Sequence, residues 1–487
     1  MIRIPVRDGG LVRLDTPSLA EPQVRIAEPR SIMRAPGASP ARRRDVAIAG
    51  VVALIALVVA AIVGPSFLRI GTVGPLTNAE DFRAFYCAGR VFREGHDPYR
   101  IEPLRACEDA AARDMGLYQQ DGMVNAAPQP PYAIAAFAVV SFLPFRAATC
   151  VWQMALLLSV IGTVLALVRM TKFPSIVIAA IVGCGSILGM LSGEIGPLVV
   201  FAIVVAALAS ASGRWNIAIA ALAVASLVPH VALPCCAALA IFRPSARRPL
   251  LILTFLFALV SVVTFGAATC IEYAFMVLPA HARSETHAIM PQYSLTTLAA
   301  LAGVPDHAAR LLGQIDYAAM MLLGGFVGGR LAERFGREEF LILVGPAFIA
   351  LGGPFIHLYQ LAVVFPAAML FASVTDGISR RWASVAVCGI LVSMFLDLAW
   401  GTSLFAPLGH GFRSQVEMLR PTDFASDAMR LWHLAQVTTD ETKIRSIVAI
   451  KMPAFVGMIG FVCIAIRVAV REKFDDTGKI YIARNIV

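Results

Sequence analysis

The sequence predicts an all-α polytopic membrane protein, a bundle of about 12 transmembrane helices with a substantial first external loop. Of its 487 residues, 58% are hydrophobic and only 15% are charged, and the mean hydropathy is +0.74. A soluble domain carries about 25% charged residues. Apolar stretches of about 20 residues, the length that crosses a bilayer, recur along the chain. Basic residues gather in the short connections between these stretches, as they do in the cytoplasmic loops of membrane proteins.

The predicted spans follow one another closely. They are 47–69, 147–168, 174–191, 195–212, 249–270, 311–329, 339–356, 358–374, 382–400 and 450–469, with two shorter ones at 216–228 and 229–242. The two shorter spans form a hairpin, because basic residues flank both its ends and Pro229 breaks it at the tip. Residues 131–143 are apolar but short, and we interpret them as re-entrant or interfacial.

The charge pattern divides the chain into three parts. Residues 1–46 are rich in arginine and lack apolar periodicity, which predicts a disordered basic cytoplasmic tail near anionic lipid rather than a cleaved signal peptide. Residues 47–470 form the transmembrane domain, and 471–487 form a cytoplasmic C-terminal tail. The external side then receives loops 70–130, 272–294 and 401–449. The net charge of +9 reports this topology and not a nucleic-acid partner.

The cysteines show no metal-site spacing. Cys87 and Cys107 both fall in the first external loop, where an oxidising environment allows a disulfide, and we hypothesise one. The sequence also lacks a P-loop, a dinucleotide-binding glycine motif, a zinc-protease motif and a nucleophile elbow. We therefore expect no cofactor and no required metal.

The polar segment 81–99 is the first one after the first predicted span. Asp81 stands beside aromatic residues near the membrane boundary, where partial desolvation suits a carboxylate to act as a general base on a hydroxyl group. The alternative is an ordinary loop aspartate or a helix cap. Aromatic residues at helical spacing, Tyr86 among them, predict an amphipathic interfacial helix. Pro98 forces Asp97 into an extended turn, which favours a structural role for Asp97.

Four other external positions are candidate substrate contacts. Glu194 is a second acid or a loop-tip glutamate, and His230 is a phosphate partner or a packed neutral histidine. Arg283 has the geometry of a phosphate clamp, although charged clusters in loops are usually just solvated. His357 joins two apolar spans, where an ionisable side chain is a functional candidate.

Segment 81–99 resembles bacterial polyprenol-phosphate-sugar-dependent glycosyltransferases of family 87, the polyprenyl-phosphate-mannose mannosyltransferases. The matching residues are Asp81, Phe82, Phe85, Tyr86, Ala88, Gly89, Gly95, Asp97, Pro98 and Tyr99. Weaker matches follow at Pro130-Pro131, Pro144, Trp152 and in the segment 354–359. The chain departs from the family at Glu194, where Gly-Gln-Asn is common, and at Val228, where a lysine often precedes the proline.

The resemblance implies an enzyme of the GT-C fold in the bacterial inner membrane, with both termini cytoplasmic and its active site facing the periplasm. The enzyme would move a hexose, mannose by default, from a polyprenyl-phosphate donor to a hydroxyl of a glycan or lipid acceptor, with inversion. Asp81 is then the catalytic base. Tyr86, Glu194, His230, Arg283 and His357 are then the residues expected to contact substrate.

Two alternatives come from other classes. A transporter would also have many spans, but its sites lie near the bilayer midplane between repeats, and this sequence shows no repeats. A ligase similar to the O-antigen ligases would centre on a large late external loop. Loop 401–449, with His410, Arg413 and His433, is the candidate for that loop.

Overall fold

The computed structural model describes residues 80–115, 124–289, 291–401, 418–437 and 440–471. The predicted first span, the N-terminal tail, nearly all of the C-terminal tail, and His410 and Arg413 lie outside these residues. The described part is helical and contains no strand, only two isolated β-bridges. It confirms an all-α protein with membrane-spanning character.

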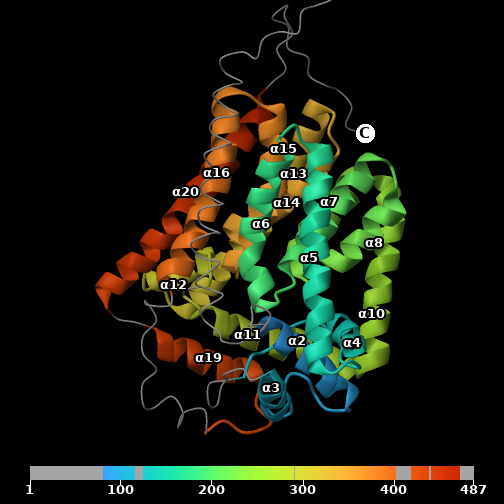
Figure 1. The fold of residues 1–487 in the computed structure, drawn as a ribbon, viewed down its shortest axis with the longest axis vertical. Helices are drawn as coiled ribbons and strands as arrows, with labels where there is room; N and C mark the ends of the chain where they lie inside the picture. The colour runs from blue at the N-terminus through green and yellow to red at the C-terminus, as the bar shows by residue number, and fades with distance from the viewer. Residues whose placement is uncertain (1–79, 116–123, 290, 402–417, 438–439, 472–487) are drawn as a thin grey trace, which may run out of the picture. The chain divides into compact units, whose positions relative to one another are not determined.

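The first group of described helices runs from α2 to α10 (Figure 1). In chain order they are α2 (Glu80–Arg93), α3 (Ile101–Met115), α4 (Pro131–Val140), α5 (Phe145–Met170), α6 (Ser175–Ser192), α7 (Gly196–Ala211), α8 (Trp215–Ala225), α9 (Pro229–Phe242) and α10 (Pro244–Glu272).

The second group begins where α10 continues through a π-helical turn, η1, into α11. In order they are η1 (Tyr273–Val277), α11 (Leu278–Glu285), α12 (Leu295–Leu301), α13 (Asp306–Phe335), α14 (Glu339–Gly352), η2 (Leu358–Val363), α15 (Val364–Val374), α16 (Gly377–Leu396), η3 (Asp397–Gly401), α19 (Ala425–Gln436) and α20 (Glu441–Val470).

Six helical segments among the described residues are long and apolar enough to cross a membrane. They are Phe145–Met170, Ser175–Ser192, Pro244–Glu285, Asp306–Phe335, Gly377–Ala399 and Glu441–Val470. The predicted span 47–69 lies outside the described residues and the remaining predicted spans correspond to shorter apolar helices, so the count of 12 stays a prediction. The predicted hairpin of 216–228 and 229–242 consists of the helices α8 and α9, with Pro229 in the first turn of α9. Helix α4 has 10 residues, about 15 Å, which is half the thickness of the hydrocarbon core and agrees with a segment that does not cross.

Arginines secure the connections at one end of the described bundle. Arg243 pairs with Glu338, Nη2 to Oε2 at 2.6 Å. Arg337 donates to the Met170 carbonyl at 2.9 Å, and Arg334 donates to the Val468 carbonyl at 2.8 Å. Helices α2, α3, α4, α11 and α19 lie together at the other end, the lower one in Figure 1.

Glycines allow two pairs of helices to approach closely. On α16, a Cβ at Gly389 would lie 2.1 Å from the Pro453 carbonyl oxygen of α20, and on α20 a Cβ at Gly457 would lie 2.8 Å from Ala386 Cα. A Cβ at Gly328 of α13 would lie 2.8 Å from the Phe340 carbonyl oxygen of α14. Small residues at such contacts are the usual basis of helix packing in membranes, where the hydrophobic effect gives helices little reason to associate.

Helix α2 is amphipathic as predicted, but its aromatic face packs against protein and not against lipid. Phe82 stacks on Trp152 of α5 with ring centroids 5.3 Å apart, and Phe85 stacks on Phe137 of α4 at 5.0 Å. Both phenylalanines are buried. After α2 the chain turns at Gly95, whose φ of +83° favours glycine. Asp97 is structural, as expected, because it accepts from Tyr99 N and from Arg100 Nε.

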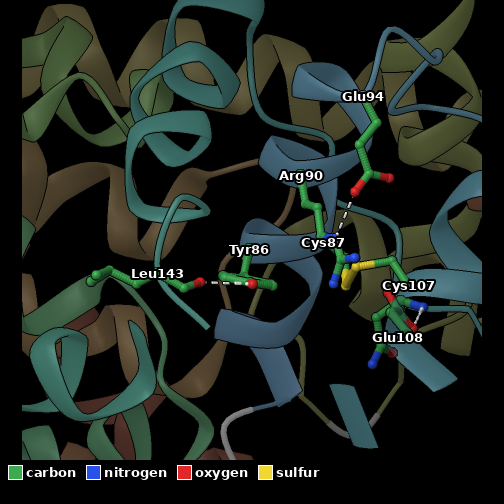
Figure 2. Close-up of a disulfide and its surroundings, with 8 residues drawn as sticks. Tyr86, Cys87, Arg90, Glu94, Cys107, Glu108 and Leu143 are labelled. Atoms are coloured by element: carbon green, nitrogen blue, oxygen red, sulfur yellow. Dashed lines mark hydrogen bonds and ion pairs between the residues drawn. A yellow bond between two sulfur atoms is a disulfide. The ribbon is translucent and has the colours of Figure 1, made fainter. Parts of the chain in front are cut away.

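A disulfide joins Cys87 of α2 to Cys107 of α3, with the Cα atoms 5.6 Å apart (Figure 2). The structure thus confirms the hypothesised pairing.

Replacing both cysteines, Cys87→Ala with Cys107→Ala, should lower stability by about 3 kcal/mol, because the bond closes a loop of 20 residues. The measurement is the Tm of the purified protein in detergent without reductant. Cys150→Ala, at a free and exposed cysteine, is the control and should leave the Tm unchanged. An unchanged Tm in the double variant would mean that the bond does not constrain the unfolded chain.

Candidate functional site

A cavity of about 970 Å³ lies between α2, α9, α10, α11 and the connection that precedes η2. One part of its lining is polar: Asp81, Glu194, His230, His281, Glu285, His357, Tyr359 and Gln360. Another part is apolar and comes from α9 and α10: Leu233, Cys236, Ala237, Ala240, Leu250, Leu251, Leu253 and Phe257. We call the first set the polar cluster and the second the apolar groove.

Asp81 stands in the first turn of α2 and reaches the cavity together with Phe85, one helical turn later. Burial raises the pKa of Asp81 to about 6, although contacts with Ser192 and His357 oppose this rise. Near neutral pH the carboxylate is therefore ionised but more basic than in water. That is the property of a general base working close to the ambient pH.

Glu194 is held at the junction of α6 and α7. Gly193 ends α6 with a φ of +72°, and Trp152 Nε1 donates to its carbonyl at 2.7 Å. The Glu194 carboxylate accepts a hydrogen bond from Gly196 N, at the start of α7. Burial, and then the charge of Asp81, raises the pKa of Glu194 to about 8. At neutral pH the side chain is a neutral carboxylic acid, which both donates and accepts as an amide does.

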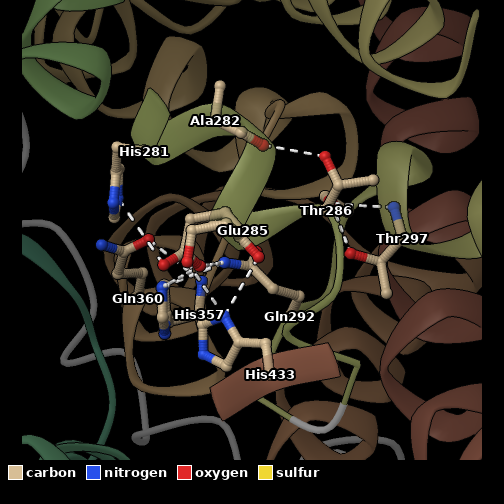
Figure 3. Close-up of polar contacts among 11 residues, drawn as sticks. His281, Ala282, Glu285, Thr286, Gln292, Thr297, His357, Gln360 and His433 are labelled. Carbon is tan, nitrogen blue, oxygen red and sulfur yellow. Dashed lines mark hydrogen bonds and ion pairs between the residues drawn. The ribbon is translucent and has the colours of Figure 1, made fainter. Parts of the chain in front are cut away.

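His357 joins the connection between α14 and η2 to α11 (Figure 3). Its Nε2 lies 3.2 Å from Glu285 Oε2 and 3.0 Å from Gln292 Nε2. Its ring stacks on Tyr359 with centroids 5.1 Å apart. Burial lowers the pKa of His357, but the carboxylate of Glu285, with a further contribution from Asp81, outweighs it and raises the pKa above the ordinary value. His357 is therefore the ring in the polar cluster best placed to carry positive charge.

His230 and His281 both line the cavity. His281 Nε2 lies 3.6 Å from Glu285 Oε1, and both rings meet Phe355 edge-on, at 6.3 Å for His230 and 5.8 Å for His281. His230 Nε2 and His281 Nδ1 are buried and have no hydrogen-bond partner among the described residues. A buried nitrogen of this kind is costly unless a ligand or water satisfies it, so both atoms are available to a bound anion or hydroxyl.

The structure brings four of the six predicted site residues to one cavity: Asp81, Glu194, His230 and His357. Tyr86 does not line it. Its hydroxyl donates to the Leu143 carbonyl at 2.9 Å (Figure 2), and its ring packs on Phe145. Arg283 does not line it either and instead interacts electrostatically with Asp427 of α19.

Sequence reasoning missed His281, Glu285, Tyr359 and Gln360 as site residues. The signal for the first two was their spacing, because residues four apart share one face of a helix. Arg283 lies halfway between them and therefore points to another side of α11. Tyr359 and Gln360 follow His357 directly and gave no separate signal.

No family model, curated protein or solved structure matches this chain. Within the described ranges, no three His, Cys, Asp or Glu side chains are grouped to hold a metal ion. The side chains of the polar cluster define the chemistry that it can perform. The cluster contains a basic carboxylate, a neutral carboxylic acid, a histidine paired with a carboxylate, and two further imidazoles.

Proposed function

We propose that the protein is an integral membrane glycosyltransferase that moves a hexose, by default mannose, from a polyprenyl-phosphate donor to an acceptor hydroxyl. One observation carries this proposal: Asp81 lies in the same cavity as an apolar groove on the surface of the bundle. Leu233 is 49% exposed and Leu251 is 70% exposed, so the groove opens where a bilayer would surround the helices. A reactive group beside such a groove suits a substrate with a lipid tail.

In the proposed reaction the polyprenyl chain occupies the apolar groove and the sugar phosphate enters the polar cluster. Asp81 removes the proton of the acceptor hydroxyl, and the resulting oxygen attacks the anomeric carbon from the side opposite the phosphate. The bond between the anomeric carbon and the phosphate oxygen breaks, and polyprenyl phosphate leaves with the electron pair. The configuration inverts, and the proton remains on Asp81 until solvent removes it.

The departing phosphate needs charge stabilisation more than protonation. His357 supplies positive charge, and the free ring nitrogens of His230 and His281 can donate hydrogen bonds to phosphate oxygens. Glu194, as a neutral acid, orients sugar hydroxyls. The disulfide favours the periplasmic face of a bacterial inner membrane as the side on which this occurs.

The test uses the purified full-length protein in lipid nanodiscs with a panel of polyprenyl-phosphate sugars and candidate acceptors. Sugar transfer, or donor hydrolysis without acceptor, from a lipid monophosphate supports the proposal. Turnover of lipid diphosphate donors alone would favour the ligase-like alternative, for which Met429 of the late helix α19, which also lines the cavity, is a supporting observation. Uptake of solute without any donor turnover would indicate a transporter.

Filling the apolar groove should discriminate between donors by the length of their lipid. Ala237→Trp places an indole among the groove residues and should raise KM about tenfold or more for a long-chain donor, because it displaces buried methylene groups. A donor with two isoprene units should be affected less. Ile241→Trp, on the same helix but outside the cavity lining, is the control. Equal KM changes for both donors would contradict the placement of the lipid in this groove.

A further inference from the structure

Lys451 is a buried cation in a membrane-spanning helix. It lies in α20, two residues before Pro453, and only 1% of its surface is exposed. Ionisable residues inside spanning helices are costly and are usually functional. Lys451 is outside the cavity, so the proposed reaction gives it no direct role.

Its contacts lead to the candidate site. Lys451 Nζ donates to the Gln292 carbonyl at 2.6 Å and lies 4.0 Å from the centre of the Tyr293 ring. Asp397, in the π-helical turn η3 that follows α16, interacts with it electrostatically and supplies the opposite charge. Lys451 therefore joins α20 and η3 to the segment that carries Gln292.

This segment is fixed against the connection that carries His357. Tyr293 N donates to the Ile356 carbonyl at 2.6 Å, and Leu358 N donates to the Pro291 carbonyl at 2.9 Å. These bonds form an isolated antiparallel bridge that sets Gln292 opposite His357. The Gln292 side chain also donates to Glu285, and Gln292 itself is 1% exposed. Lys451 thus holds the backbone carbonyl of Gln292, while Glu285 holds its side-chain amide.

Nε2 of His357 faces both the side-chain amide of Gln292 and the carboxylate of Glu285. The Gln292 amide nitrogen, 3.0 Å away, only donates, so it favours a neutral ring that carries its proton on Nδ1. Glu285 Oε2, 3.2 Å away, only accepts, so it favours a ring that is protonated on Nε2 and donates to it. The position of Gln292 relative to Glu285 therefore influences which hydrogen bond Nε2 makes.

We infer that Lys451 is a positioning residue for the candidate site: it holds the Gln292 backbone opposite His357, and through Gln292 it sets the position and the hydrogen bonding of the His357 ring. The charged and titratable groups around His357 are Asp81, Glu194, His230, His281, Glu285 and His433. None of them belongs to α20, so Lys451 acts through Gln292 and not by facing the ring. The expected effect on kcat rests on the proposed function, but the expected change in the hydrogen bonding of His357 does not.

The test follows His357 by NMR in protein with ¹³C,¹⁵N-labelled histidine, with the His357 signals assigned by their loss in His357→Gln. The variant is Lys451→Met with Asp397→Leu, which removes both buried charges together and so leaves neither uncompensated. We expect its His357 tautomer signals to change and its His357 titration midpoint to shift by about half a pH unit or more. With a competent donor, kcat should fall about tenfold while KM stays within about twofold.

Two further variants keep the result interpretable. Lys451→Arg retains a donor for the Gln292 carbonyl and should keep the wild-type His357 signals, so it remains informative if the double variant fails to fold. Arg445→Met, at an exposed position of α20, is the control.

Unchanged His357 signals in a folded double variant would overturn the inference, whether or not any donor is turned over. A loss of kcat with unchanged His357 signals would overturn it too. Changed signals in a protein whose wild type turns over no donor would support the inference and count against the proposed function.

Discussion

Asp81→Asn should reduce the rate of sugar transfer by about 10²- to 10⁴-fold, the range over which a general base contributes. Asparagine keeps the size of the side chain but cannot take a proton from the acceptor hydroxyl. Asp81 is partly buried in the first turn of α2, so the variant should fold and its Tm should stay close to that of the wild type. The measurement is kcat for a long-chain polyprenyl-phosphate donor in nanodiscs.

The pH dependence gives a second readout of the same group. Burial places the pKa of Asp81 at about 6, and a base must be unprotonated to act. The wild-type rate should therefore rise as the pH increases through about 6, and the residual rate of Asp81→Asn should lack this rise. Glu94→Gln, at an exposed residue just beyond the same helix that pairs with Arg90, is the matched control and should behave like the wild type. A rate in Asp81→Asn close to that of the wild type would move the role of base to another group, with Glu194 the nearest candidate.

Much of the fold was predictable because the bilayer imposes a simple rule on sequence. Apolar runs of the right length had to become helices, and Arg243, Arg337 and Pro229 marked where they begin or end. The disulfide was predictable for a related reason, since both cysteines fell in one external loop. The sequence predicted the helix ends less well. Helix α20 begins at Glu441, nine residues before the predicted span. Hydropathy does not reveal such a start, because the polar helical turns outside the bilayer have no hydropathy signal.

The site was harder because it depends on distant segments meeting. Asp81, Glu194 and His357 each stood out as unusual side chains beside apolar spans, and the structure places all three on one cavity. The segment 272–294 was predicted to be a charged loop, and this favoured Arg283 as a residue that contacts substrate. The chain instead continues helically through η1 and α11 to Glu285, and so turns His281 and Glu285 toward the cavity and Arg283 away from it. Lys451 and Gln292, buried in separate elements, gave no pattern that would join them.

His357→Gln should lower kcat for transfer by about 10²-fold, because it removes the positive charge that faces the departing phosphate. Glutamine retains a hydrogen-bond donor, so donor binding should weaken less than turnover. The measurement is the separate determination of kcat and KM for the same donor. His96→Gln, at an exposed histidine just beyond α2, is the control.

The loss of kcat in His357→Gln depends on Glu285, the carboxylate that pairs with His357. Without the imidazole, Glu285 keeps its charge inside the polar cluster, and that charge repels the phosphate. Glu285→Gln in the His357→Gln background should therefore recover part of the lost rate, while Glu285→Gln alone should lower the pKa of His357 and reduce the rate near neutral pH. If the two losses instead simply multiply, His357 and Glu285 act independently. His357 would then serve as a contact for substrate, and its positive charge would not depend on the pair.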